Sequence, residues 1–260
     1  MRILCLLPVL LMSATADAKL VRKPVPYEID GAPYEGVLVY DDAVRAPRPG
    51  LLLVPNWLGV NEDNLVQAAE VAGRAYVVFV ADVFGTAVRP KSPAEASAVV
   101  APLKADRAVL RKRVAAAREA FRSQFKTAGV DAAKEGAIGF CFGGTAVLEL
   151  AKSGADVRGV VSFHGGLDAV VPTGERPKAR ILALHGADDP FVPAPDVQAF
   201  KDDLRNAGAD WTLVEFGGAV HSFTDRKANV PRKNQFDPAV AARAYRLMND
   251  FFSETFAAGR

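Results

Sequence analysis

The stretch AIGFCFGGTAVLEL, residues 137–150, places a cysteine where an apolar run ends and a helix-like run begins. Cys141 has Gly139 two residues before it and Gly143 two residues after it, which is the G-x-nucleophile-x-G spacing of a sharp strand-to-helix turn. Glycines at these positions let the strand and the helix approach closely. The spacing predicts that Cys141 leaves the sheet and sits at a helix N-terminus, where peptide dipoles favour the nucleophilic thiolate.

Two other interpretations of this turn are an inert, buried cysteine and a degenerate phosphate-binding loop. The phosphate loop is disfavoured because Cys141 occupies the place of the second glycine in GxGxxG. We therefore favour a nucleophilic cysteine.

Short apolar segments alternate with longer amphipathic stretches along the chain. The apolar segments are 50–55, 75–81, 136–140, 158–163, 179–185 and 211–216, and the amphipathic stretches are 93–126, 145–153, 194–207 and 238–256. Apolar strands separated by helices predict an α/β fold with a mostly parallel central sheet covered on both faces. Residues 25–29 and 36–40 lack a helix between them, so we expect an antiparallel N-terminal hairpin at the sheet edge.

The composition is that of an ordinary globular protein. Half of the 260 residues are hydrophobic, and the net charge of +2 does not indicate a nucleic-acid partner. Three histidines without an HExxH or CxxC pattern argue against a metal site, and no organic cofactor is indicated. We expect one domain over residues 19–260, acting on a small molecule as a monomer or a weak homodimer.

The N-terminus has the pattern of a secretory signal peptide. Arg2 precedes an apolar run over residues 3–12, and Ala16 and Ala18 form a small-x-small cleavage site. Cleavage after Ala18 would export the protein to the periplasm or the medium, remove Cys5 and leave Cys141 as the only thiol of the mature chain. No membrane association is expected after cleavage, although an uncleaved anchor is the alternative interpretation.

A cysteine nucleophile requires a base and an acid that orients the base. In the strand-turn-helix fold these follow the nucleophile in the order acid, then histidine. His221 follows the last apolar segment on a glycine-rich loop, whereas His164 and His185 precede the candidate acids. Asp188 and Asp189 are adjacent, and spacing alone does not choose between them.

Several stretches together resemble the dienelactone hydrolase family of α/β-hydrolases, a cysteine-nucleophile branch of a mostly serine fold. They are LLLVPNWLGVNE (51–62), VADVFG (80–85), IGFCFGG (138–144), HGADDPFVP (185–193) and VHSFTD (220–225). The resemblance implies that Cys141 is the nucleophile, Asp189 the acid and His221 the base. It also implies an oxyanion hole formed by the backbone N–H groups of Trp57 and Phe142.

The chain departs from this family around the substrate. The well-studied members have a glutamate at the position of Asn56 and hold a substrate carboxylate with two arginines, where this chain has Thr86 and Asp225. The resemblance thus implies an ester or lactone hydrolase with a substrate other than the dienelactone carboxylate itself. Arg89 and Arg226 are the nearby candidates to replace the missing arginines.

We expect the substrate to contact Asn56, Thr86 and an aromatic set that line an apolar pocket. The aromatic residues are Trp57, Phe84, Phe142 and Phe223, and core packing is the alternative role for Phe84 and Phe223. Two competing functions are a non-catalytic binding protein of the same fold and a thiol-based redox protein. The redox protein is disfavoured because the mature chain has no resolving cysteine.

Overall fold

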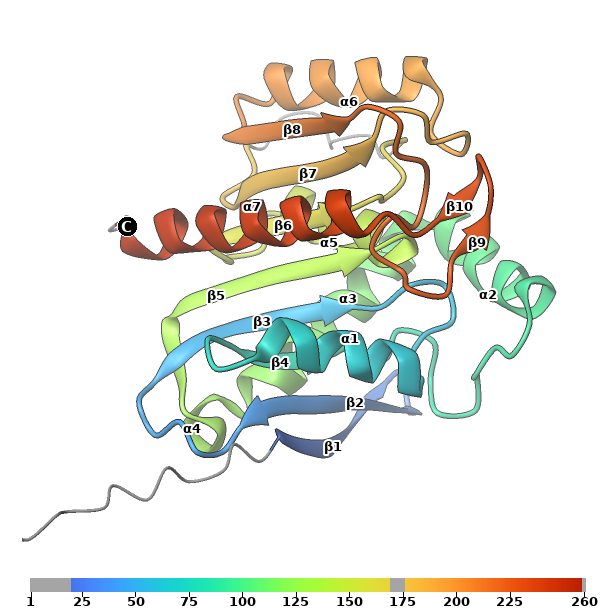
Figure 1. Cartoon of the computed structure of the whole chain (residues 1–260). Coiled ribbons are helices and arrows are strands. Elements are labelled where there is room, and N and C mark those ends of the chain that lie inside the picture. The colour runs from blue at the N-terminus through green and yellow to red at the C-terminus, as the bar shows by residue number, and fades with distance from the viewer. Residues whose placement is uncertain (1–19, 169–175, 259–260) are drawn as a thin grey trace, which may run out of the picture.

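The computed structural model describes residues 20–168 and 176–258, and the expected signal peptide lies outside them. Within these residues, eight strands form one sheet in the order β1-β2-β4-β3-β5-β6-β7-β8 (Figure 1). The strands are β1 (Leu20–Ile29), β2 (Ala32–Asp41), β3 (Arg48–Val54), β4 (Val77–Val80), β5 (Val130–Phe140), β6 (Gly159–Phe163), β7 (Arg180–Gly186) and β8 (Trp211–Phe216). The neighbours from β4 to β8 are parallel, whereas β1 pairs with β2 and β2 with β4 in antiparallel fashion. The predicted class and the N-terminal hairpin are confirmed.

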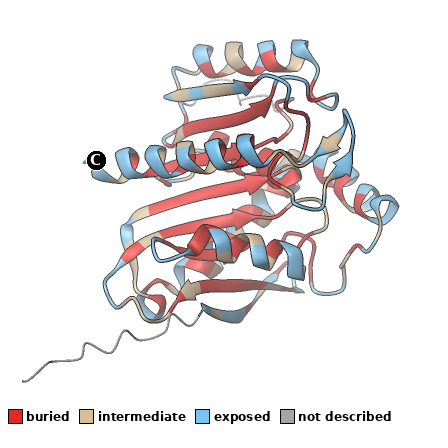
Figure 2. Ribbon diagram, viewed as in Figure 1, coloured by how far each residue is buried: buried red, intermediate tan, exposed pale blue. Residues whose placement is uncertain are grey.

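Helices cover both faces of the sheet. They are α1 (Glu62–Ala72), α2 (Pro93–Ala105), α3 (Arg107–Arg122), α4 (Phe125–Ala128), α5 (Phe142–Lys152), α6 (Ala194–Asn206) and α7 (Pro238–Ala257). Side chains alternate between the faces along each strand. Leu52 joins the core beneath α3, α5 and α6, whereas Leu51 and Leu53 join the core beneath α1 and α7. Buried segments therefore run through the middle of the molecule, and helices expose their outer sides (Figure 2).

The structure refines the expected elements in three places. The stretch 93–126 is divided at Asp106, whose carboxylate caps α3 by accepting the backbone N–H groups of Ala108 and Val109. Helix α1 was not foreseen, although Asn61 caps it by the same kind of contact to Asn64. The short strands β9 (Asn229–Val230) and β10 (Asn234–Gln235) form a small second sheet.

The carboxyl ends of the parallel strands bring distant segments together. Strands β3, β5, β7 and β8 end on the side of the sheet where α2 and the β9–β10 pair lie (Figure 1). Strand β10 joins the loop after β8 through an isolated bridge between His221 and Asn234. Open α/β sheets carry their chemistry at these strand ends, so this edge is the place to examine.

Candidate active site

Cys141 occupies a strained turn between β5 and α5. Its backbone has φ 55° and ψ −119°, a conformation that L-residues seldom adopt. A Cβ atom at Gly139 would lie 1.9 Å from the Gly143 carbonyl oxygen, and one at Gly143 would lie 1.9 Å from the Val54 carbonyl oxygen. The two glycines are therefore required by close backbone contacts that hold the cysteine above the strand ends.

A Gly143→Ala substitution tests this geometry. The clash is with backbone, which cannot move aside without displacing β3, so we expect a loss of at least about 3 kcal/mol of stability and a melting temperature lower by about 10 °C. Gly217→Ala is the matched control because no atom lies within 4 Å of a Cβ placed there. Equal melting temperatures of the two variants would contradict the proposed role of Gly143.

The structure joins Cys141, His221 and Asp189 in one hydrogen-bonded chain. His221 Nε2 lies 3.1 Å from Cys141 Sγ, and His221 Nδ1 lies 2.7 Å from Asp189 Oδ2. Both His221 and Asp189 are buried, whereas Asp188 is exposed. The other Asp189 oxygen accepts the Phe191 backbone N–H at 2.9 Å. Burial and the contact with His221 therefore distinguish Asp189 from Asp188, a choice that spacing alone leaves open.

Electrostatics in this chain favour the ion pair of thiolate and imidazolium. Burial alone would raise the pKa of the Cys141 thiol, but the charge and hydrogen bond of His221, the Phe142 N–H and the charge of Lys104 together lower it. Burial alone would lower the pKa of His221, but the Cys141 thiolate and the Asp189 carboxylate raise it. Each partner stabilises the charged form of the other. The arrangement can supply a thiolate nucleophile at a pH below the ordinary pKa of a thiol.

His164 links the turn at Cys141 to the loop that carries His221. Its Nδ1 lies 3.2 Å from the Cys141 backbone nitrogen and accepts that N–H, and its Nε2 lies 2.8 Å from Thr224 Oγ1. Burial and the neighbouring His221 keep the pKa of His164 well below its ordinary value. A neutral His164 holds the turn in place, and its Nδ1 already accepts the Cys141 N–H and so does not face the thiol as an acceptor.

Trp57 and Phe142, the residues expected to form an oxyanion hole, line the same cavity as Cys141. The Phe142 N–H donates to Cys141 Sγ. The Trp57 N–H has no protein acceptor within residues 20–168 and 176–258. Backbone N–H groups beside a nucleophile can stabilise an oxyanion.

A cavity of about 280 Å³ opens above Cys141. Its lining combines apolar and polar residues from several elements: Trp57, Ser97, Val100, Ala101, Lys104, Cys141, Phe142, Thr145, Gly166, Phe191, Val192, His221, Ser222 and Asn234. Helix α2 contributes four of these residues, and the loops after β7 and β8 contribute four more. This volume is at the lower end of the range for ligand sites, so the cavity suits a small substrate.

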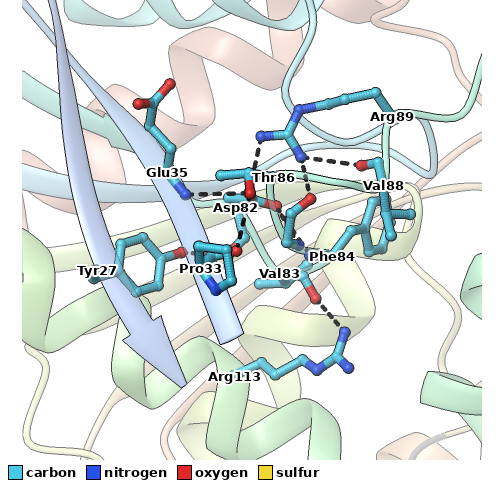
Figure 3. Close-up of polar contacts among 11 residues, drawn as sticks. Tyr27, Pro33, Glu35, Asp82, Val83, Phe84, Thr86, Val88, Arg89 and Arg113 are labelled. Atoms are coloured by element: carbon cyan, nitrogen blue, oxygen red, sulfur yellow. Dashed lines mark hydrogen bonds and ion pairs between the residues drawn. The ribbon is translucent and has the colours of Figure 1, made fainter. Parts of the chain in front are cut away.

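Asp82 holds the segment that carries three of the residues expected near the substrate. The buried carboxylate accepts the N–H groups of Phe84 and Gly85 and pairs with Arg89 at 2.9 Å (Figure 3). Phe84 is consequently buried against the Phe142 ring, and Thr86 is exposed and bonded to the Pro33 carbonyl group. The structure therefore places Phe84, Thr86 and Arg89 outside the lining of the main cavity.

The other expected substrate contacts also lie elsewhere. Phe223 is fully buried and packs edge-on against the His164 ring. The side-chain oxygen Oδ1 of Asn56 accepts hydrogen bonds from the Leu58 backbone N–H and from Asn64 Nδ2. Asn56 lines a separate cavity of about 20 Å³, which also borders Cys141 and Asp225 and has room for about one water molecule.

Arg226 does not line the main cavity. It pairs with Glu70 at 3.3 Å and lies over the Phe236 ring. Since Arg89 is bonded to Asp82, neither arginine near the expected positions faces Cys141 in this structure.

The sequence interpretation missed most of the cavity wall. Ser97, Lys104 and Asn234 come from α2 and β10, and their local sequence carries no signal for a site. Phe191 lies inside the stretch HGADDPFVP and had a usable signal, its position two residues after Asp189. Among the described residues, no three potential metal ligands form a group, and none of the described helices is long and apolar enough to span a membrane.

Comparisons with known proteins agree with the fold described above. The sequence profile of the dienelactone hydrolase family matches residues 34–256. An uncharacterized protein of Caenorhabditis elegans is 33% identical over 153 residues, which are 57% of this chain and 95% of that protein. A Bradyrhizobium protein named "Probable 2-oxo-3-(5-oxofuran-2-ylidene)propanoate lactonase" is 28% identical over 67% of this chain and 73% of its own length.

A solved structure is similar over almost its whole length. It is a dienelactone hydrolase-like promiscuous phosphotriesterase from metagenomic libraries, with 34% sequence identity and a TM-score of 0.84. The superposition covers 91% of this chain and 98% of that chain. The arrangement of strands and helices around the nucleophile turn is thus shared with a dienelactone hydrolase-like protein.

Proposed function

Because the chain belongs to the dienelactone hydrolase family and is a hydrolase of ester or lactone substrates, we propose that Cys141, His221 and Asp189 perform this hydrolysis as a catalytic triad. The hydrogen-bonded chain from thiol to imidazole to carboxylate is the observation that carries the proposal. The C–O bond of the substrate is cleaved in two steps, through an acyl thioester on Cys141.

The first step forms the thioester. The Cys141 thiolate attacks the carbonyl carbon, and the N–H groups of Trp57 and Phe142 stabilise the developing oxyanion by roughly 3 kcal/mol per donor. The tetrahedral intermediate then collapses and its C–O bond breaks. The departing oxygen takes the proton from Nε2 of the His221 imidazolium, so the alcohol leaves neutral and the imidazole becomes neutral as well.

The second step restores the enzyme. Neutral His221 removes a proton from water, and the hydroxide oxygen attacks the thioester carbonyl. The C–S bond breaks, the acid product leaves, and the thiolate and imidazolium are restored. Asp189 fixes the tautomer of His221 and stabilises the imidazolium in both steps.

A direct test of this function measures the hydrolysis of short-chain aryl esters and simple lactones by the purified protein, with and without iodoacetamide. We expect hydrolysis that iodoacetamide abolishes at a rate that follows alkylation of Cys141. Hydrolysis that persists after complete alkylation would contradict the proposal, and so would a protein that binds these compounds without cleaving them.

We propose further that the preferred substrate is neutral. A carboxylate that loses its water in an apolar pocket requires a charge-assisted partner. Arg89 and Arg226 are held elsewhere, and Lys104, the cation among the residues that line the cavity, is exposed to solvent. The lactone that names the Bradyrhizobium relative is a propanoate, so a different substrate is proposed for this chain.

This preference predicts a higher kcat/KM for the neutral member of a matched pair, for example a methyl ester and the corresponding free acid of one lactone. We expect a preference of about tenfold or more, because an unpaired carboxylate forfeits at least about 1.4 kcal/mol of hydration. Efficient turnover of the carboxylate would contradict the proposal. If Lys104→Met then removed that turnover, Lys104 would be identified as the anion's partner.

We propose that the protein is exported after cleavage behind Ala18, as the N-terminal sequence pattern indicates. N-terminal sequencing of periplasmic or secreted material is expected to begin at Lys19, and the denatured mature chain is expected to contain a single titratable thiol. Recovery of the intact chain, beginning at Met1, from the membrane fraction would replace export with an uncleaved anchor.

A further inference from the structure

Phe191 combines exposure with a place at the active site. Among the described residues it is the most exposed of the large hydrophobic side chains, at 56%. It also lines the cavity above Cys141. A single exposed apolar side chain is ordinary on a protein surface, but this ring stands beside the candidate nucleophile and base, where a bound substrate would bury it.

The position of the Phe191 ring is fixed by the catalytic residues themselves. Its backbone N–H donates to Asp189 Oδ1 at 2.9 Å, while the other oxygen of that carboxylate holds His221. The Phe191 ring meets the His221 ring edge-on, with centroids 5.3 Å apart and an interplanar angle of 80°. The next residue, Val192, is buried and anchors the loop. The Phe191 ring is thus held in a fixed position beside His221.

The contact with His221 determines which part of the substrate meets Phe191. His221 gives its proton to the departing oxygen, so the alcohol portion of the ester must lie within reach of Nε2. A ring packed against His221 therefore lies beside the alcohol portion. Val100 and Ala101 of α2 line the same cavity and make it apolar on a second side.

We infer that Phe191 is a specificity-determining residue that binds the departing alcohol of the substrate, and that the preferred substrates are esters whose alcohol portion is aromatic or similarly flat and apolar. This inference rests on the proposed hydrolysis at Cys141. Offset or edge-to-face contact with an aromatic group adds binding energy beyond simple burial. A bound apolar group also excludes water from His221 and strengthens the electrostatic interactions there.

The test compares benzyl acetate with methyl acetate, because both esters form the same acyl thioester and their alcohols have similar acidity. We expect the wild-type enzyme to favour benzyl acetate in kcat/KM. Phe191→Ala should lower the benzyl-to-methyl ratio about tenfold, mainly through KM, since one ring contact and its burial are lost. Phe191→Tyr should keep most of the preference. Val230→Ala is the control because Val230 is similarly exposed, at 50%, and does not line the cavity.

The outcomes separate this inference from the proposed function. If the wild type hydrolyses neither acetate nor other simple esters, the proposed function fails. If it hydrolyses both acetates but Phe191→Ala leaves their ratio unchanged, or lowers it no more than Val230→Ala does, the role of Phe191 is refuted. A melting temperature of Phe191→Ala close to that of the wild type establishes that the altered ratio comes from the site.

Discussion

Removal of either the nucleophile or the base is expected to nearly abolish hydrolysis. Cys141→Ala and His221→Ala should each reduce kcat by about 10⁴-fold or more, and the double variant should lose little beyond either single one. The reason is joint action, because a thiol without its base is mostly protonated and a base without its thiol has no nucleophile to activate. Steady-state rates with one aryl ester measure all three variants.

Additive losses in this cycle would contradict the triad. If the double variant lost the product of the two single factors, Cys141 and His221 would act independently. The 3.1 Å contact between His221 Nε2 and Cys141 Sγ would then have no catalytic meaning. His164→Gln is an informative companion variant, since His164 also touches the nucleophile turn but is expected to position Cys141 without transferring its proton.

Asp189→Asn is expected to have the second-largest effect. An amide cannot stabilise the His221 imidazolium and favours the wrong imidazole tautomer, so kcat should fall by up to about 10⁴-fold. The pKa of His221 should fall and that of the Cys141 thiol should rise, because each ion stabilises the other. The midpoint of Cys141 alkylation by iodoacetamide should therefore move to higher pH.

Asp188→Asn is the matched control for this change. Its carboxylate is adjacent in sequence but exposed, so the activity and the alkylation midpoint should stay close to those of the wild type. The reverse order of the two aspartate variants would mean that the acid had been assigned to the wrong residue.

The fold class and the strand-turn-helix geometry at Cys141 are readable from the sequence because both depend on local patterns. Apolar runs mark the strands, and the ±2 glycines around Cys141 mark the turn between β5 and α5. His221 is distinguished from the other two histidines by chain order alone. The choice between Asp188 and Asp189 required the family resemblance, because their burial is decided by how the loop after β7 packs.

The residues that line the cavity are not predictable from the sequence, because tertiary packing determines them. Phe84 and Phe223 are aromatic and lie in stretches that resemble the family, yet their rings are buried in the core. Lys104 reaches the cavity from the last turn of α2, and Asn234 reaches it from β10. No periodicity in either segment indicates which neighbour it will face. Only the assembled edge of the sheet brings these side chains to Cys141.

The central claim is that catalysis passes through an acyl thioester on Cys141, and rapid-quench mass spectrometry of the enzyme during turnover of p-nitrophenyl acetate tests it most directly. The account predicts one added acetyl group, located on the peptide that contains Cys141. The adduct should form in the first turnover with a burst of p-nitrophenol and decay on removal of substrate. Sustained hydrolysis with the acetyl group on another residue, or with the protein never acylated at any quench time, would contradict it.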